Sequence, residues 1–142
     1  MVVQDRRQEK TCCFYVSDFH LEMILVPYIN EKIDENITII TEKKLKETIK
    51  ILISKMNLNE ENKEKILNLG WDGEDEIREN TNIIIIGTRE YIKNKNNQIK
   101  NAVTVLDCYN FEEEKDNMED ILKEYKNTLN TLGKSNFWKF LV

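Results

Sequence analysis

Continuous apolar runs alternate with segments of helical spacing along this chain, and the first run is the clearest. Residues 12–16 are Cys-Cys-Phe-Tyr-Val, a pattern typical of a strand covered on both faces. Ser17 or Asp18 can then cap a helix, because an apolar stripe at helical spacing follows over residues 21–28. A second apolar run at residues 37–40 completes a predicted strand–helix–strand unit.

The middle of the chain continues this alternation. Thr41 is predicted to cap a helix whose apolar stripe extends to Met56. Asn59 is predicted to begin a short second helix that Gly70 ends as a left-handed cap. The acidic segment 74–79 is predicted to be a solvated loop or a loose helical turn.

The third predicted strand holds four consecutive isoleucines, residues 83–86, and must therefore be central and buried. Thr88 can cap the next helix, although an edge hairpin is an alternative there because that segment is rich in asparagine and lysine. A fourth strand is predicted over residues 102–106, ending at Asp107. The final helix is predicted over residues 118–132.

Strands that alternate with helices predict a mostly parallel sheet, because a parallel crossover needs a helix-sized connection. We therefore expect a three-layer α/β fold, Rossmann-like or RecA-like, with four or five strands and helices on both faces. The 142 residues fit one domain. Residues 1–10 are expected to be a flexible arm and residues 11–142 the domain. Its apolar tail, residues 136–142, either docks as an edge strand or mediates contacts.

Charge and composition bear on the partners, the location and the source of the protein. The net charge of −5 argues against nucleic acid and against an anionic membrane as partner, since both usually require a basic face. No apolar run is long enough to cross a bilayer, and the first ten residues are polar, so a cytoplasmic location is expected. The richness in Ile, Lys, Asn and Glu is typical of AT-rich genomes and favours a bacterial source.

The three cysteines are expected to be reduced core residues. All of them lie within or next to predicted strands, and their number is odd. Cys12 and Cys13 are neighbours on one strand, so their side chains point to opposite faces and do not readily grip one metal ion. Because His20 is the only histidine, no metal site is predicted.

Candidate site residues cluster where the predicted strands end. Open parallel sheets bind ligands at the carboxyl ends of their strands, toward which helix N-termini also point. The polar residues predicted at these ends, which equally suit plain helix capping, are Ser17, Asp18, His20, Thr41, Glu42, Gly87, Thr88, Arg89, Asp107 and Tyr109. We assign ligand binding to all of these except Glu42 and Gly87.

Three roles within this crevice can be distinguished. His20 is the only residue that could act as a histidine general base, although a cap or a surface position also explains it. Arg89 could hold a carboxylate or a phosphate. Asp18 and Asp107 could meet across adjacent strand ends and bind a divalent cation, but the sequence offers no third ligand.

The absence of several sequence motifs narrows the range of possible functions further. The chain contains neither G-x-x-x-x-G-K-[ST] nor G-x-G-x-x-G, and its four glycines leave little room for another phosphate cradle. It also lacks the G-x-S-x-G elbow of serine hydrolases. No cofactor is therefore expected, and catalysis is disfavoured.

Three segments together resemble the MEDS-type sensory domain, a RecA-like module that lacks a working phosphate loop. Residues 13–15 resemble its opening strand, and residues 27–41 resemble its first helix and second strand. Residues 107–111, Asp-Cys-Tyr-Asn-Phe, are similar to its late Cys-x-Tyr-Asp stretch. The chain departs from the family in lacking a glycine before the second strand and a histidine before the first, and its middle is shorter. The resemblance implies a sensory or regulatory role.

Three functional hypotheses follow. The first is a non-catalytic regulatory or sensory domain of the bacterial cytosol that binds a small molecule or a protein partner. The second is a small enzyme that uses Asp18, His20, Arg89 and Asp107 in the strand-end crevice. The third is a self-associating module, such as a homodimer, that uses the face around Phe19 and the tail around Trp138.

Overall fold

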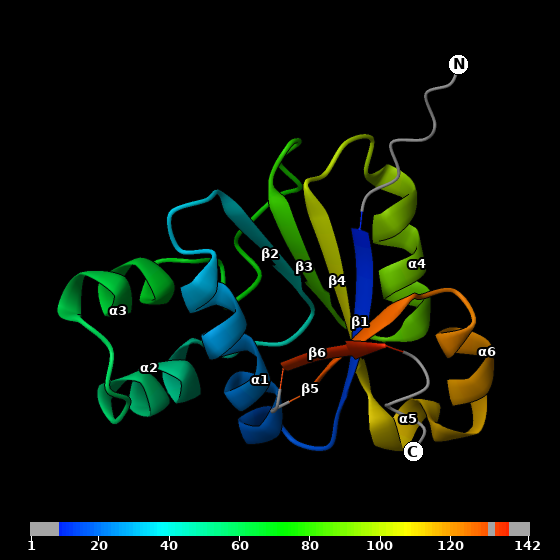
Figure 1. Ribbon diagram of the computed structural model, residues 1–142, viewed down its shortest axis with the longest axis horizontal. Helices are drawn as coiled ribbons and strands as arrows, with labels where there is room; N and C mark the ends of the chain where they lie inside the picture. The colour runs from blue at the N-terminus through cyan, green and yellow to red at the C-terminus, as the bar shows by residue number, and fades with distance from the viewer. Residues whose placement is uncertain (1–8, 131–132, 137–142) are drawn as a thin grey trace.

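The apolar runs form neighbouring strands of one open sheet in the computed structural model, which describes residues 9–130 and 133–136 (Figure 1). The elements in chain order are β1 (Glu9–Tyr15), α1 (Asp18–Glu31), β2 (Ile37–Thr41), α2 (Lys46–Ser54), α3 (Glu60–Leu67), β3 (Asn82–Ile86), α4 (Arg89–Gln98), β4 (Thr104–Asn110), α5 (Phe111–Glu114), η2 (Lys115–Asn117), α6 (Met118–Leu122), β5 (Asn127–Asn130) and β6 (Gly133–Asn136). None of the described helices is long and apolar enough to span a membrane.

The sheet has the strand order β2-β3-β4-β1-β5-β6. Strands β1 to β5 are mutually parallel, and β6 pairs antiparallel with β5. The predicted α/β class and the mostly parallel sheet are therefore confirmed, with β6 as an additional antiparallel strand. Every residue of β2 and β3 is buried, as the continuous isoleucine runs predict.

Two hydrophobic cores lie on opposite faces of the sheet and make the three layers (Figure 1). One core joins alternate strand residues to α1, α2 and α3. The other core joins the intervening strand residues to α4 and α6. Cys13 and Cys108 belong to the first core and Cys12 to the second, and all three are buried free thiols. This division follows from the alternation of side chains along a strand.

Local capping chemistry explains three of the helix starts. Ser17 accepts a hydrogen bond from the His20 backbone N–H at 3.1 Å at the start of α1. Asn59 and Thr88 cap α3 and α4 in the same way. The prediction of a helix after Thr88 is therefore confirmed, and the alternative hairpin is wrong. These caps satisfy N–H groups that have no partner inside the helix.

The start of α2 differs from the prediction. Thr41 does not cap this helix, because it ends β2 and its hydroxyl accepts from the Lys43 N–H at 2.9 Å. The helix begins only at Lys46, whose N–H donates to the Asp72 carboxylate at 2.9 Å. The cap therefore comes from a residue distant in sequence, which local pattern cannot reveal.

The loop between α3 and β3 covers the edge of the sheet that β2 forms. Asp75 accepts a hydrogen bond from the Ile39 N–H at 3.3 Å, and the Arg78 guanidinium donates to the Ile37 carbonyl at 2.7 Å. These bonds block two backbone groups of β2 that would otherwise be open to another strand. Gly70 is not a left-handed cap, since only Gly73 among the described glycines has a positive φ. A Cβ on Gly70 would instead lie 2.5 Å from Asp75 Cγ, so glycine is needed for close approach.

The predictions for both ends of the domain need correction. The predicted helix over residues 118–132 stops at Leu122, and residues 127–130 form β5, which pairs with β1. Strand pairing in the sheet therefore outweighs the helical spacing of the apolar residues. Strand β1 starts at Glu9, two residues before the predicted domain start. The rest of the predicted arm (1–8) and of the apolar tail (137–142) lies outside the described residues.

Candidate functional site

The predicted crevice lies at a topological switch point of the sheet. Neighbouring strands β1 and β4 are followed by connections that leave in opposite directions, through α1 to β2 and through α5 and α6 to β5 (Figure 1). Such points are the usual ligand sites of open parallel sheets. We therefore locate each predicted site residue relative to the ends of β1 and β4.

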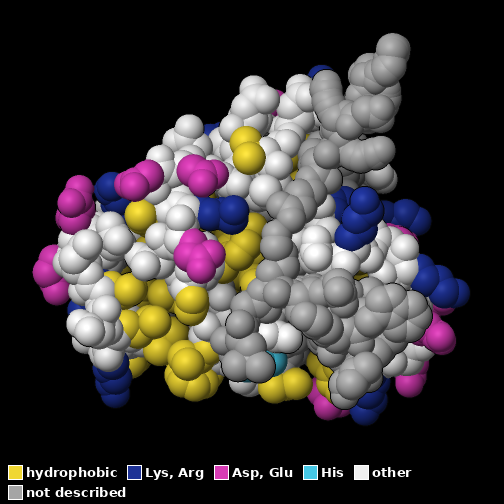
Figure 2. All heavy atoms as spheres, in the orientation of Figure 1, with side chains coloured by type: hydrophobic (Ala, Val, Ile, Leu, Met, Phe, Trp, Pro, Cys, Tyr) yellow, Lys and Arg dark blue, Asp and Glu magenta, His cyan; other side chains and the backbone are white. Residues whose placement is uncertain are grey.

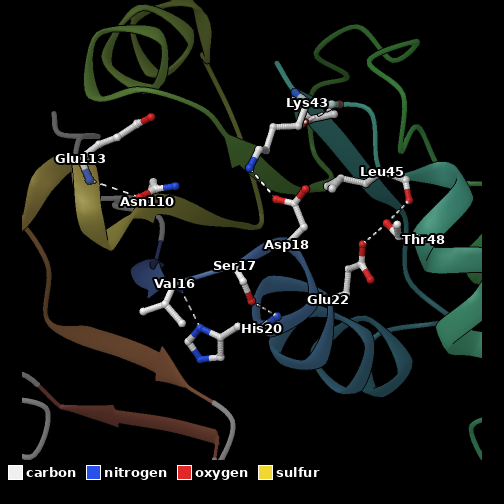
Figure 3. A network of polar contacts seen from close by, with 11 residues as sticks. Val16, Ser17, Asp18, His20, Glu22, Lys43, Leu45, Thr48, Asn110 and Glu113 are labelled. Atoms are coloured by element: carbon white, nitrogen blue, oxygen red, sulfur yellow. Dashed lines mark hydrogen bonds and ion pairs between the residues drawn. The ribbon is translucent and has the colours of Figure 1, made fainter.

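Ser17, Asp18 and His20 do lie together just beyond β1 (Figure 3). The Asp18 carboxylate pairs with the Lys43 ammonium at 2.5 Å. The His20 Nδ1 atom accepts a hydrogen bond from the Val16 N–H at 2.9 Å. These bonds tie the β1–α1 turn to the segment after β2, so the side chains already have structural partners.

Thr88 connects the ends of β2 and β3 to α4. Its backbone N–H donates to the Glu42 carboxylate at 2.9 Å, and its hydroxyl accepts from the Tyr91 N–H at 3.2 Å. A Cβ at Gly87 would lie 2.5 Å from the Tyr91 ring and 2.6 Å from Glu42 Oε1. Glycine is therefore required for this packing, and Gly87 serves the architecture of the strand end.

Asp107 does not lie at a strand end, which corrects the predicted crevice. Strand β4 continues to Asn110, and Asp107 stands opposite Cys12 in the middle of β1. Asp18 lies beyond the end of β1, so the two carboxylates cannot share a cation. Among the described residues, no group of three or more His, Cys, Asp or Glu side chains is placed to hold a metal ion.

Asp107 is instead the centre of a buried polar cluster on the α4 face. Its side chain is 0% exposed, and its Oδ2 accepts a hydrogen bond from the Tyr125 hydroxyl at 2.5 Å. The Tyr109 and Tyr125 hydroxyls are 2.6 Å apart. Because Tyr125 donates to Asp107, Tyr109 is the donor to Tyr125. Asn96 of α4 also donates to both Asp107 oxygens, at 3.1 and 3.2 Å.

Burial controls the protonation of this cluster. Desolvation raises the pKa of Asp107 above its usual 3.8, although Lys10, Tyr125 and Asn96 oppose that rise. The Lys10 ammonium lies 3.7 Å from Asp107 Oδ2 and 5.1 Å from the centre of the Tyr125 ring. Burial and the nearby Asp107 also raise the pKa of Tyr109 and of Tyr125. Both phenols are therefore protonated at neutral pH.

A cavity of about 740 Å³ opens beside this cluster. Its walls come from α4, from β1 and β4, and from the segment that follows α6. The lining residues are Lys10, Arg89, Glu90, Ile92, Lys93, Asn96, Asn97, Tyr109, Glu124 and Tyr125. We call this space the α4 cavity. It falls within the size range of about 300–1,000 Å³ that is usual for small-molecule sites.

The structure thus divides the predicted site residues into two groups. Arg89 and Tyr109 line the α4 cavity, and Asp107 bonds to Tyr125 in its wall. Ser17, Asp18, His20 and Thr41 belong to the strand-end network around α1 and β2. Thr88 lies immediately before Arg89 but bonds to Glu42.

Sequence reasoning missed Lys10, Asn96 and Tyr125 as partners of Asp107 and Lys93 as a wall residue of the α4 cavity. The sequence pattern places Lys10 in the predicted arm and Tyr125 in the apolar stripe of a predicted helix. The single available signal was an aspartate two residues from both Val105 and Tyr109, since a period of two puts all three on one face. A carboxylate on a buried face requires polar partners.

A second buried carboxylate, Glu22 of α1, lies on the opposite face of the sheet. It is 1% exposed and accepts a hydrogen bond from the Thr48 hydroxyl (Figure 3). Desolvation raises its pKa, and the bond from Thr48 opposes the rise. Glu22 therefore joins α1 to α2 and is separated from the α4 cavity by the sheet.

No protein-family model, curated protein or solved structure matches this chain. The resemblance to MEDS-type sensory domains accordingly stays a prediction.

Proposed function

We propose that this chain is a non-catalytic regulatory or sensory domain of the bacterial cytosol that binds a small molecule in the α4 cavity. The observation that carries the proposal is the cavity itself, which has the volume of a metabolite site and a wall of hydrogen-bonding side chains. The predicted resemblance to sensory domains supports the same role. Three buried free thiols suit a reducing compartment.

The chemistry of the cavity supports binding without catalysis. A general base must be able to take a proton near neutral pH. Tyr109 and Tyr125 have raised pKa values and stay protonated there. The single histidine lies in the strand-end network, where its Nδ1 already accepts a hydrogen bond. The lining side chains can therefore orient a ligand, whereas they supply no paired nucleophile and base.

Filling the cavity is the direct test. We expect Asn97→Trp to abolish small-molecule retention, because Asn97 is an exposed residue of the cavity wall and an indole there would occupy ligand space. The matched control is Asn94→Trp, since Asn94 is also exposed on α4 but does not line the cavity. The measurement is equilibrium dialysis against a small-molecule extract of bacterial cells, followed by mass spectrometry of compounds enriched with the protein.

The expected result is one compound enriched by the wild type and by Asn94→Trp but not by Asn97→Trp. Enrichment by all three proteins would locate binding elsewhere. Enrichment by none of them would contradict the proposal. Circular dichroism of each variant shows whether the fold is kept, so that lost retention is not mistaken for unfolding.

Self-association is a second candidate, supported by exposed apolar side chains where α1 begins. Phe19 is 61% exposed, Val16 58% and Met23 38%. Hydrophobic side chains also gather over α1 and α2 in the space-filling view (Figure 2). Contiguous exposed apolar surface of this kind often marks a protein contact.

If this face joins two copies, Phe19→Asp is expected to convert a dimer into a monomer of 16.9 kDa. Val103→Asp is the matched control, because Val103 is 52% exposed and precedes β4, whereas Phe19 follows the parallel strand β1, so the two lie at opposite ends of the sheet. Light scattering after size-exclusion chromatography gives the mass directly. A monomeric wild type would reject this candidate and leave the ligand-binding proposal unaffected.

A further inference from the structure

Two basic side chains of the α4 cavity have no partner within the part of the chain that the structure describes. Arg89 and Lys93 are four residues apart, so they lie on the same side of α4, and both line the cavity. Arg89 is half-buried. No described carboxylate forms an ion pair with either side chain, and no described residue accepts a hydrogen bond from them. Lysine and arginine side chains gather over α4 in the space-filling view (Figure 2).

We infer that the α4 cavity selects a small organic anion, with a carboxylate or phosphate-ester group held by Arg89 and Lys93. This inference rests on the proposed function, because it assigns the chemical class of the ligand that the cavity binds. The neutral part of the ligand then faces the Tyr109 and Tyr125 hydroxyls and the Asn97 amide.

The guanidinium group supplies the main reason for an anion. A half-buried charge without a partner is unfavourable, because it has lost part of its hydration. A carboxylate or phosphate restores the lost interactions, since its oxygens match the paired N–H donors of arginine. Lys93 adds a positive charge beside that group. Arg89 is also the first residue of α4, so an anion bound there lies near the positive end of the helix dipole.

The remaining charges limit the size and charge of this anion. Lys10 is engaged by Asp107 at 3.7 Å, which leaves Arg89 and Lys93 as the available cations among the described residues of the cavity wall. Glu90 and Glu124 also line the cavity, and their carboxylates repel a ligand that carries many negative charges. The cavity therefore suits a metabolite with one anionic group in preference to a nucleoside triphosphate.

The test divides the small-molecule extract on an anion-exchange resin. One dialysis uses the fraction that the resin retains, and a second uses the neutral and cationic flow-through. We expect the enriched compound to come from the retained fraction and to elute from the resin at low salt. Its measured mass then distinguishes a carboxylate from a phosphate ester.

Charge removal identifies the contacts. We expect the double variant Arg89→Gln/Lys93→Gln to lower retention by at least about tenfold, since hydrogen bonds to charged groups are lost. The matched control is Lys95→Gln/Lys100→Gln, which removes two positive charges from the same segment without touching the cavity wall. Retention should also weaken as NaCl is raised.

The possible outcomes separate this inference from the function on which it rests. A compound enriched from the flow-through, or one retained equally by Arg89→Gln/Lys93→Gln, would overturn the anion assignment. The proposed function would survive if Asn97→Trp still abolished that retention. Enrichment from neither fraction would overturn both. If the compound that the protein enriches is a polyphosphate, the expectation of a single anionic group is wrong.

Discussion

Replacing Trp71 with alanine should lower the free energy of unfolding by about 3–5 kcal/mol, as expected for a buried aromatic side chain. Trp71 is 0% exposed and belongs to the core formed with α1, α2 and α3. Its indole N–H donates to the Ile66 carbonyl at 2.7 Å. Its own carbonyl accepts from the Leu45 N–H at 2.9 Å. The variant leaves a large cavity and removes one hydrogen bond to the Ile66 carbonyl, which still accepts from the Leu69 N–H at 3.2 Å.

Chemical denaturation followed by fluorescence or circular dichroism measures this loss. Trp71→Phe helps to separate the two causes, because it removes the indole N–H donor but keeps a large part of the buried aromatic volume. We expect it to lose less stability than Trp71→Ala. Ile51→Ala is the control for an exposed apolar position, with an expected change within about 0.5 kcal/mol. A loss below about 1 kcal/mol for Trp71→Ala would contradict the described packing.

The residue pattern was sufficient wherever local chemistry determines structure. The isoleucines of β3 can only be buried, and Ser17, Asn59 and Thr88 cap helices through bonds to residues three positions later. Parallel pairing follows from the alternation of strands and helices. These features need no knowledge of distant contacts, and the structure confirms them.

Features that depend on distant partners could not be predicted in this way. Asp72 caps α2 although it is distant from that helix in sequence. Asp75 and Arg78 cover the edge of β2, although they belong to the segment 74–79 that is predicted to be a solvated loop or a loose helical turn. Leu129 continues the helical spacing of Leu122 and Tyr125, yet residues 127–130 become β5 because β1 offers backbone partners.

The candidate site shows the same limit. The apolar run of β4 ends at Leu106, so the sequence placed the strand end at Asp107. The strand in fact continues to Asn110, since Asn96, Tyr125 and Lys10 satisfy the buried carboxyl group. The sequence therefore placed Arg89 correctly after β3, but it placed Asp107 and Tyr109 at the end of β4 or beyond it, whereas both lie within that strand.

The second large effect concerns Asp107 and pH. Burial raises the pKa of Asp107 in the folded protein above its usual 3.8, so the folded state binds the proton more tightly than the unfolded state. The associated stability is full below the unfolded pKa and is lost as pH rises through the folded pKa. Asp107→Asn removes this titration. The stability of the wild type relative to the variant should therefore fall as pH rises above about 4.

The expected slope in that window is at most about 1.4 kcal/mol per pH unit, because one proton is exchanged. Denaturation curves of both proteins at intervals from pH 4 to 8 give the difference in unfolding free energy. Asp116→Asn is the control, since Asp116 is exposed and its removal should leave a pH profile parallel to the wild type. A wild type that gains stability over Asp107→Asn with rising pH would contradict the prediction.

Lys10 affects the pH at which this loss of stability is complete. Its ammonium opposes the rise in the pKa of Asp107, because a nearby positive charge favours the ionised carboxylate. Lys10→Gln should therefore raise that pKa further and extend the pH range over which the wild-type stability is lost. An unchanged range would mean that Lys10 contributes little. The carboxylate would then depend chiefly on Tyr125 and Asn96, whose hydrogen bonds also position the polar wall of the α4 cavity.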